Sequence, residues 1–86
     1  MKTAKYFSAK WCGPCKVFKP VMEELSQEGY FIQFIDGDEE MKLANQYGIR
    51  SIPTTVIEEE DETQVLREIR RIVGVRTKEQ MIKELS

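Results

Sequence analysis

The stretch "AKWCGPCKVF", residues 9–18, contains the only two cysteines of this 86-residue chain, Cys12 and Cys15. The six residues that lead into it, "TAKYFS" at 3–8, predict a short strand. Behind it the apolar residues recur at helical spacing, at Phe18, Val21, Met22 and Leu25. We therefore expect the cysteine pair to lie where a strand ends and a helix begins. Pro20 falls inside the helical pattern and predicts a kink, and Gly29 predicts its end.

The rest of the chain predicts two further helices and three further strands. Residues 30–35, "YFIQFI", favour a strand, and Asp38 is placed to cap a helix that ends at Gly48. The β-branched segment 52–59 and the segment 67–73 predict a hairpin, with "EEEDE" at 58–62 as its solvated tip. Thr77 and Gln80 form a capping-box pattern for a last helix. The apolar residues expected in the core include Phe7, Phe31, Phe34, Leu43, Ala44, Tyr47, Met81, Ile82 and Leu85.

This order, β-α-β-α-β-β-α, predicts an α/β fold with one mixed four-stranded sheet flanked by helices, in a single domain over residues 1–86. The net charge of −2 gives no indication of nucleic acid or membrane as a partner. No apolar run is long enough for a membrane span, and the N-terminus shows no signal-peptide pattern. We therefore expect a cytoplasmic protein, in a compartment that keeps thiols reduced.

Three interpretations of the cysteine pair are open. A structural disulfide closing so short a loop would contribute only about 2 kcal/mol and needs an oxidising compartment. A structural metal site needs four ligands, whereas the chain offers two cysteines and no histidine. The third interpretation is thiol chemistry, because the first turn of a helix has free N–H groups that favour a thiolate on Cys12. Gly13 and Pro14 suit the tight entry into that turn, and the charge of Lys16 adds to the same effect.

The segment "WCGPCK", residues 11–16, resembles the active site of thioredoxins. The resemblance extends to Pro20, to "YGIRSIPT" at 47–54 and to Gly74, and it covers the chain from about Tyr6 to Leu85. It implies a thioredoxin fold in a minimal form, without the extra strand and helix with which typical thioredoxins begin. It also implies a protein disulfide reductase without a cofactor or metal, whose redox group is the Cys12–Cys15 dithiol.

By the same resemblance, Cys12 attacks the substrate disulfide and Cys15 resolves the mixed disulfide, with Cys15 the more buried of the two. Trp11, Ile52, Pro53 and Gly74 are expected to line a shallow substrate groove, with a cis peptide bond before Pro53. Gly13, Pro14 and Lys16 are expected to support the active site. The implied partners are protein disulfides, ribonucleotide reductase among them, and a recharging enzyme of the thioredoxin-reductase type.

Three departures from the family pattern lead to predictions. Tyr6 and Phe34 stand where thioredoxins keep a buried aspartate and lysine, so the proton acceptor for Cys15 is open and we expect resolution to slow at neutral pH. Without the extra family strand, residues 30–35 form a sheet edge, which we expect to be covered by a terminus or used in a weak dimer of an otherwise monomeric protein. The closing hairpin is also longer than in the family, and its acidic run or its basic stretch at 67–71 is a candidate for partner selection.

Two other functions compete with a thioredoxin-type reductase. A glutathione-linked reductase of the glutaredoxin type fits the minimal core, although "WCGPC" argues against it. A non-catalytic binding module that has kept the motif is the alternative from a different class.

Overall fold

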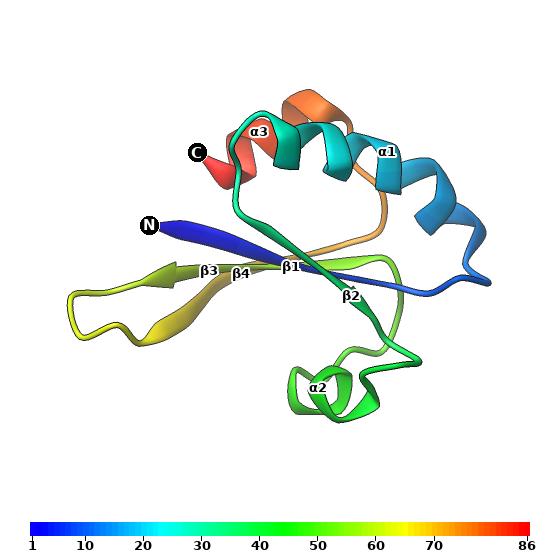
Figure 1. The fold of residues 1–86 in the computed structure, drawn as a ribbon, viewed down its shortest axis with the longest axis horizontal. Helices are drawn as coiled ribbons and strands as arrows, with labels where there is room; N and C mark the ends of the chain where they lie inside the picture. Colours follow the sequence, from blue (N-terminus) through cyan, green and yellow to red (C-terminus); the bar gives the residue numbers. More distant parts are fainter.

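The computed structural model describes residues 1–86 as a four-stranded sheet with helices on both faces (Figure 1). The elements follow the predicted order: β1 (Lys2–Ser8), α1 (Gly13–Gln27), β2 (Ile32–Asp36), α2 (Met41–Gln46), β3 (Thr54–Glu60), β4 (Leu66–Val73) and α3 (Lys78–Leu85). The strand order is β2-β1-β3-β4, with β1 parallel to β2 and antiparallel to β3. The predicted α/β class and mixed sheet are therefore confirmed.

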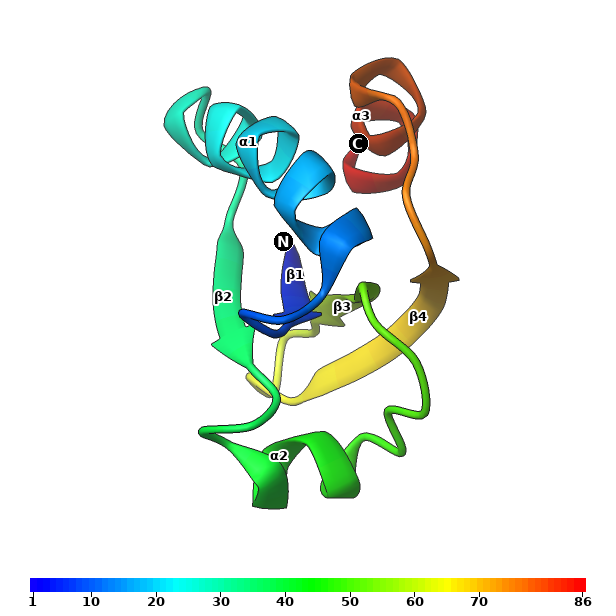
Figure 2. The same cartoon turned by 90° about the vertical axis from the view of Figure 1, so that its right-hand side faces the viewer.

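The core forms two layers because side chains alternate along β1. Ala4 and Tyr6 point to the face covered by α1 and α3, where the larger apolar cluster lies. Phe7 points to the opposite face and packs with Ile35 and Val56 under α2. The two views place α1 and α3 on one side of the sheet and α2 on the other (Figures 1 and 2). None of the helices has both the length and the apolar content needed to cross a membrane.

Helix ends follow the local sequence closely in α1 and α3. Helix α1 begins directly after Cys12, continues through Pro20, and ends with Gly29 at a φ of 105°. The N–H of Tyr30 then donates to the carbonyl of Leu25, which closes the last turn. At α3 the Thr77 side chain accepts from the Gln80 N–H, and the Gln80 side chain accepts from the Thr77 N–H, so the predicted capping box is confirmed.

The start of α2 differs from the prediction. The helix begins at Met41 after Glu40, which makes no side-chain cap, so the assignment of Asp38 as the N-cap is wrong. The side chain of Asp36 accepts the N–H groups of residues 38 and 39, and this turn delays the helix. The expected α2 residues pack against the cluster around Phe7 but remain only partly buried, namely Leu43, Ala44 and Tyr47.

Two aromatic residues expected in the core lie at the surface. Phe31 is 59% exposed and Phe34 is 38% exposed, whereas Phe7 is fully buried as predicted. The reason is topological: β2 is an outer strand of the sheet, and no further strand lies beside it. The rings of Phe34 and Tyr6 pack edge to face, with their centroids 5.7 Å apart. The expectation that a terminus covers this edge is not met at Phe31 and Phe34.

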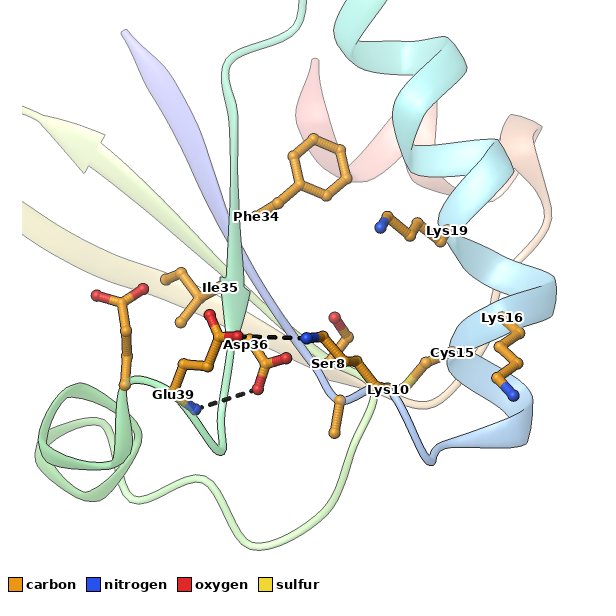
Figure 3. Close-up of a pocket in the computed structure, with 11 residues that line it drawn as sticks. Ser8, Lys10, Cys15, Lys16, Lys19, Phe34, Ile35, Asp36 and Glu39 are labelled. Carbon is orange, nitrogen blue, oxygen red and sulfur yellow. Dashed lines mark hydrogen bonds and ion pairs between the residues drawn. The ribbon is translucent and has the colours of Figure 1, made fainter.

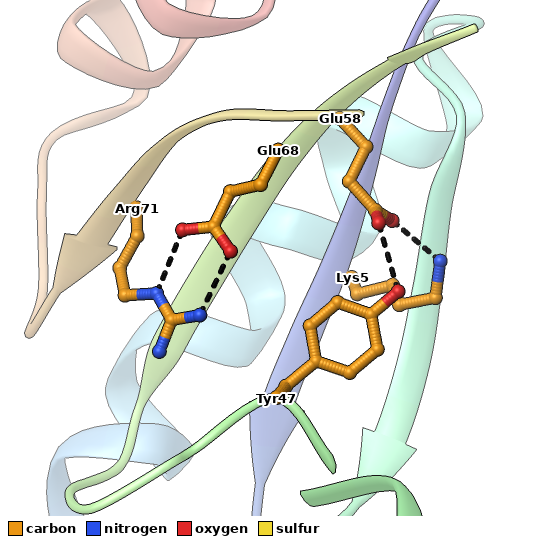
Figure 4. Close-up of polar contacts among 5 residues, drawn as sticks. All are labelled: Lys5, Tyr47, Glu58, Glu68 and Arg71. Carbon is orange, nitrogen blue, oxygen red and sulfur yellow. Dashed lines mark hydrogen bonds and ion pairs between the residues drawn. The ribbon is translucent and has the colours of Figure 1, made fainter. Parts of the chain in front are cut away.

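The acidic run at residues 58–62 was expected to form a solvated hairpin tip, but its first residue is buried in the sheet. Glu58 is only 4% exposed and belongs to β3, next to an irregularity in its pairing with β4. Its carboxylate forms an ion pair with Lys5 and accepts the hydroxyl of Tyr47 at 2.8 Å (Figure 4). Burial alone would lower the pKa of Lys5, but the hydrogen bonds and charges of Glu58 and Tyr47 together raise it. Through these contacts Tyr47, at the C-terminal end of α2, is held against Glu58 of β3 and Lys5 of β1.

Candidate active site

The two cysteines lie at the junction of the β1 end and α1, and they form a disulfide bond with their Cα atoms 5.2 Å apart. Cys12 is the N-cap residue of α1, and its sulfur accepts the backbone N–H of Cys15 at 3.2 Å. A sulfur at this position lies at the positive end of the helix dipole, and this stabilises a thiolate once the disulfide is reduced. Pro14 occupies the first turn, where a missing N–H costs nothing.

Both cysteines are 3% exposed, so the expected greater burial of Cys15 is not seen in the disulfide form. They pack with Ala9 and the side chain of Ile52 in a small cluster at the end of the sheet. The Cys12 sulfur lies 3.9 Å from the carbonyl oxygen of Ile52. The segment 50–53 and the N-terminal turn of α1 therefore meet at the disulfide, although Cys12 and Ile52 are 40 residues apart in the chain.

The Ile52–Pro53 peptide bond is cis. The carbonyl of Pro53 accepts the N–H of Gly74 at 2.8 Å, which places Gly74 beside this segment. Gly74 has a φ of 92°, a conformation that side chains other than glycine rarely adopt. The backbone N–H and carbonyl of Ile52 make no backbone hydrogen bond, so both stay available to an added strand. The sequence-predicted residues 52, 53 and 74 are thus brought together, and Ile52 joins them to Cys12.

Trp11 is 69% exposed, and its indole N–H donates to the carboxylate of Asp38 at 2.8 Å. Trp11 and Ile52 also line one shallow surface depression, in front of α2. Asp38 was not among the predicted site residues, because its spacing indicated a helix cap. The only signal that could have suggested its role is that it follows a strand that ends beside the cysteine turn.

Behind the cysteines, a groove of about 470 Å³ lies between α1 and β2 (Figure 3). Cys15 forms part of its wall, together with Lys16, Lys19, Phe34, Asp36 and Glu39. Lys10 forms an exposed ion pair with Glu39 at 3.5 Å across its mouth. The groove gives the otherwise buried Cys15 a route to charged side chains and water on the β2 side.

Tyr6 lies under α1, at the position where the family resemblance implies a buried aspartate. It is fully buried, and its hydroxyl donates to the carbonyl oxygen of Cys15 at 3.3 Å. Burial, with a smaller contribution from the charge of Glu23, raises the pKa of Tyr6 to about 12. The phenol therefore stays neutral at the pH where thiols exchange.

No three histidine, cysteine, aspartate or glutamate side chains come close enough together to hold a metal ion. What the site offers is a redox-active pair of sulfurs at a helix N-terminus, a free backbone segment beside it, and an exposed indole. This combination suits thiol–disulfide exchange with an extended polypeptide.

Comparisons with known proteins agree with this geometry. The family model for thioredoxin matches residues 4–86. The thioredoxin of Chlamydia muridarum is 35% identical over 82 residues, covering 93% of this chain and 76% of that protein. The thioredoxin of Bacillus subtilis is 42% identical over 76 residues, covering 85% of this chain and 68% of that protein.

Among solved structures, a point-mutant thioredoxin from Halobacterium salinarum superposes with a TM-score of 0.82. It is 29% identical, and the match covers 98% of this chain and 71% of that one. The family match spans nearly the whole chain and includes the cysteine pair. The chain therefore belongs to the thioredoxin family and is a thiol–disulfide oxidoreductase, a protein disulfide reductase.

Proposed function

We propose that Cys12 is the attacking thiol and Cys15 the resolving thiol of this reductase. The observation that carries the assignment is that the Cys12 sulfur caps α1 and accepts the Cys15 N–H, beside Ile52. Stabilisation of the thiolate by the helix terminus acts on Cys12 and makes it the stronger nucleophile at neutral pH. Lys16, in the first turn of the helix, adds a positive charge, while Gly13 and Pro14 shape the turn.

The reaction proceeds in two exchanges. The Cys12 thiolate attacks one sulfur of the substrate disulfide, forms a mixed disulfide, and releases the other substrate sulfur as a thiolate that takes up a proton. The Cys15 thiolate then attacks the Cys12 sulfur, which releases the second substrate thiol and leaves the Cys12–Cys15 disulfide. Two electrons pass to the substrate, and a recharging reductase restores the dithiol.

Substrate binding is assigned to the surface around the Cys12 sulfur. Trp11, Ile52 and Gly74 provide the accessible part of a shallow surface, while Pro53, expected to line it, is fully buried behind Ile52 and contributes through its cis peptide bond. The free N–H and carbonyl of Ile52 pair with an extended substrate segment. Thioredoxins generally act on protein disulfides and are recharged by thioredoxin reductase, so these are the partner classes we propose here. Ribonucleotide reductase is one candidate substrate, and the cytoplasm is the proposed location.

Trapping tests the roles of the two cysteines. A reduced Cys15→Ser variant, incubated with a mixture of disulfide-containing proteins, should accumulate mixed disulfides on Cys12, whereas Cys12→Ser should not. Both variants should lose insulin reduction with dithiothreitol as the electron source. Mixed disulfides that form equally on Cys15 in the Cys12→Ser variant would contradict the assignment.

Two further outcomes separate the competing functions. Reduction that requires glutathione would indicate a glutaredoxin-type enzyme. Full biological activity of a variant with both cysteines replaced by serine would indicate a binding module.

A further inference from the structure

A groove of about 430 Å³ between β4 and α3 carries a concentration of positive charge. Four of the residues that line it are cationic, Arg70, Arg71, Arg76 and Lys83, against one carboxylate, Glu84. The chain as a whole has a net charge of −2. We call this surface the basic groove. Its local charge is positive, whereas the net charge of the protein is negative.

The four cations are not equally neutralised. Arg71 makes a bidentate pair with Glu68, at 2.9 and 2.8 Å (Figure 4), and Arg70 makes a longer contact with Glu84, at 3.5 Å. Arg76 and Lys83 have no carboxylate within the 4.0 Å of an ion pair. Since only Arg70 and Arg71 form ion pairs, the charges of Arg76 and Lys83 remain free to bind a partner.

Arg76 also reaches the proposed substrate groove. Its Nη1 donates to the carbonyls of Val73 and Val75, at 3.3 and 2.9 Å, which fixes the guanidinium without cancelling its charge. A Cβ atom at Gly74 would lie 3.7 Å from that nitrogen. Gly74 in turn donates its N–H to Pro53. The segment that rises from β4 to α3 (Figure 2) thus joins the basic groove to the residues beside Cys12.

We propose that the basic groove selects protein substrates whose disulfide is flanked by acidic residues, with Arg76 as the first contact and Lys83 as the second. This inference rests on the proposed function, because it assigns a specificity to the same exchange site. Opposite charges raise the rate of productive encounter more than the rate of chemistry, and salt screens the effect. Arginine suits this role because its fork can pair with a carboxylate in two places.

An acidic polypeptide fits the basic groove better than a nucleic acid does. Acidic residues outnumber basic ones in the chain, 15 to 13. Only two groove cations are without a carboxylate partner, whereas nucleic-acid affinity grows with the number of neutralised phosphates. A short run of glutamates or aspartates needs no more than these two contacts.

The test uses three disulfide peptides with one common core and flanks of glutamate, glutamine or lysine. At low ionic strength, kcat/KM for the glutamate peptide should exceed that for the glutamine peptide by about 3- to 10-fold, and about 0.3 M salt should remove the difference. Arg76→Gln and Lys83→Gln should each reduce this ratio, and the double variant should bring it close to 1. Lys42→Gln, which removes one charge on α2, is the matched control and should leave the ratio unchanged.

Equal kcat/KM values for the three peptides with the unaltered protein would overturn the inference, as would a preference that survives in the double variant. Loss of the ratio in Lys42→Gln to the same extent would show an effect of net charge alone and would also overturn it. Competition by a single-stranded oligonucleotide that exceeds competition by polyglutamate would reassign the groove to nucleic acid. Failure to reduce even the glutamine peptide would contradict the proposed function itself, and so the two failures are distinguishable.

Discussion

The hydroxyl of Tyr6 lies 3.3 Å from the carbonyl oxygen of Cys15, inside the layer between the sheet and α1. The ring is wedged edge-on between Phe18 and Phe34, with each centroid 5.7 Å away. A neutral aromatic donor thus lies under the cysteine turn, at the position where the thioredoxin resemblance implies a carboxylate. The raised pKa of Tyr6 means that this group holds its proton while the thiols exchange.

The first prediction is that Tyr6 is not the proton acceptor for Cys15. Tyr6→Phe keeps the ring packing and removes only the hydroxyl, so the rate of mixed-disulfide resolution should keep its pH profile between about pH 6 and pH 9, where the phenol stays protonated. Stopped-flow measurement of Trp11 fluorescence after mixing with a mixed-disulfide precursor would report the rate. A pH profile that changes shape or shifts by about one pH unit in Tyr6→Phe would contradict the prediction.

The second prediction concerns alkaline stability. Because the folded-state pKa of Tyr6 is raised to about 12, from an ordinary value near 10, the folded state favours the protonated phenol. This contribution is fully present below about pH 10 and is lost as the pH rises through about 12, with a total of roughly 2–3 kcal/mol. Urea unfolding from pH 9 to 12 should show a steeper loss in the unaltered protein than in Tyr6→Phe. Parallel curves would contradict the assignment, since Tyr47 titrates in both proteins.

The third prediction concerns the buried pair of Lys5 and Glu58. Glu58→Ala leaves the ammonium of Lys5 in a mostly buried site without its partner, which should lower the free energy of unfolding by about 3 kcal/mol. The double variant Lys5→Met/Glu58→Leu removes both charges and should recover most of that loss. Urea denaturation measures both values. Additive losses in the double variant would show that the two charges are not coupled.

The fourth prediction uses the single tryptophan of the chain as its own reporter. Asp38→Ala removes the acceptor of the Trp11 indole N–H, so the exposed ring should become more mobile and its fluorescence anisotropy should fall. Asp38→Asn keeps a carbonyl acceptor and should preserve most of the anisotropy. The contact is at the surface, so the free energy of unfolding should change by no more than about 0.5 kcal/mol. A large loss of stability would indicate instead that Asp38 supports the start of α2.

The fifth prediction concerns the β2 edge. The exposed ring of Phe31, directly before β2, and the unpaired outer side of the strand favour weak association of two copies. Sedimentation velocity should detect dimers only near about 1 mM, the affinity expected from a small contact. Phe31→Lys should abolish them, because it places a charge on the edge. A monomer at this concentration, with fast amide exchange along residues 32–36, would count against any docking at this edge.

The sequence by itself determined the features that depend on neighbours in the chain. The helix start at Cys12, its end at Gly29 and the Thr77–Gln80 capping box each involve groups within a few residues of one another. The cysteine pair could be identified for the same reason, since its two sulfurs lie within one helical turn. Strand and helix periods are also local, which is why the element order was predicted correctly.

Only the tertiary structure decided which charges and rings are buried. Glu58 belongs to an acidic run, yet Lys5 and Tyr47 come from two other elements to enclose it. Phe31 has the residue type of a core position, but it directly precedes β2, which the strand order places at the outside of the sheet. The same holds for Asp38 beside Trp11. Burial depends on segments far apart in sequence, whose relative positions a local pattern does not specify.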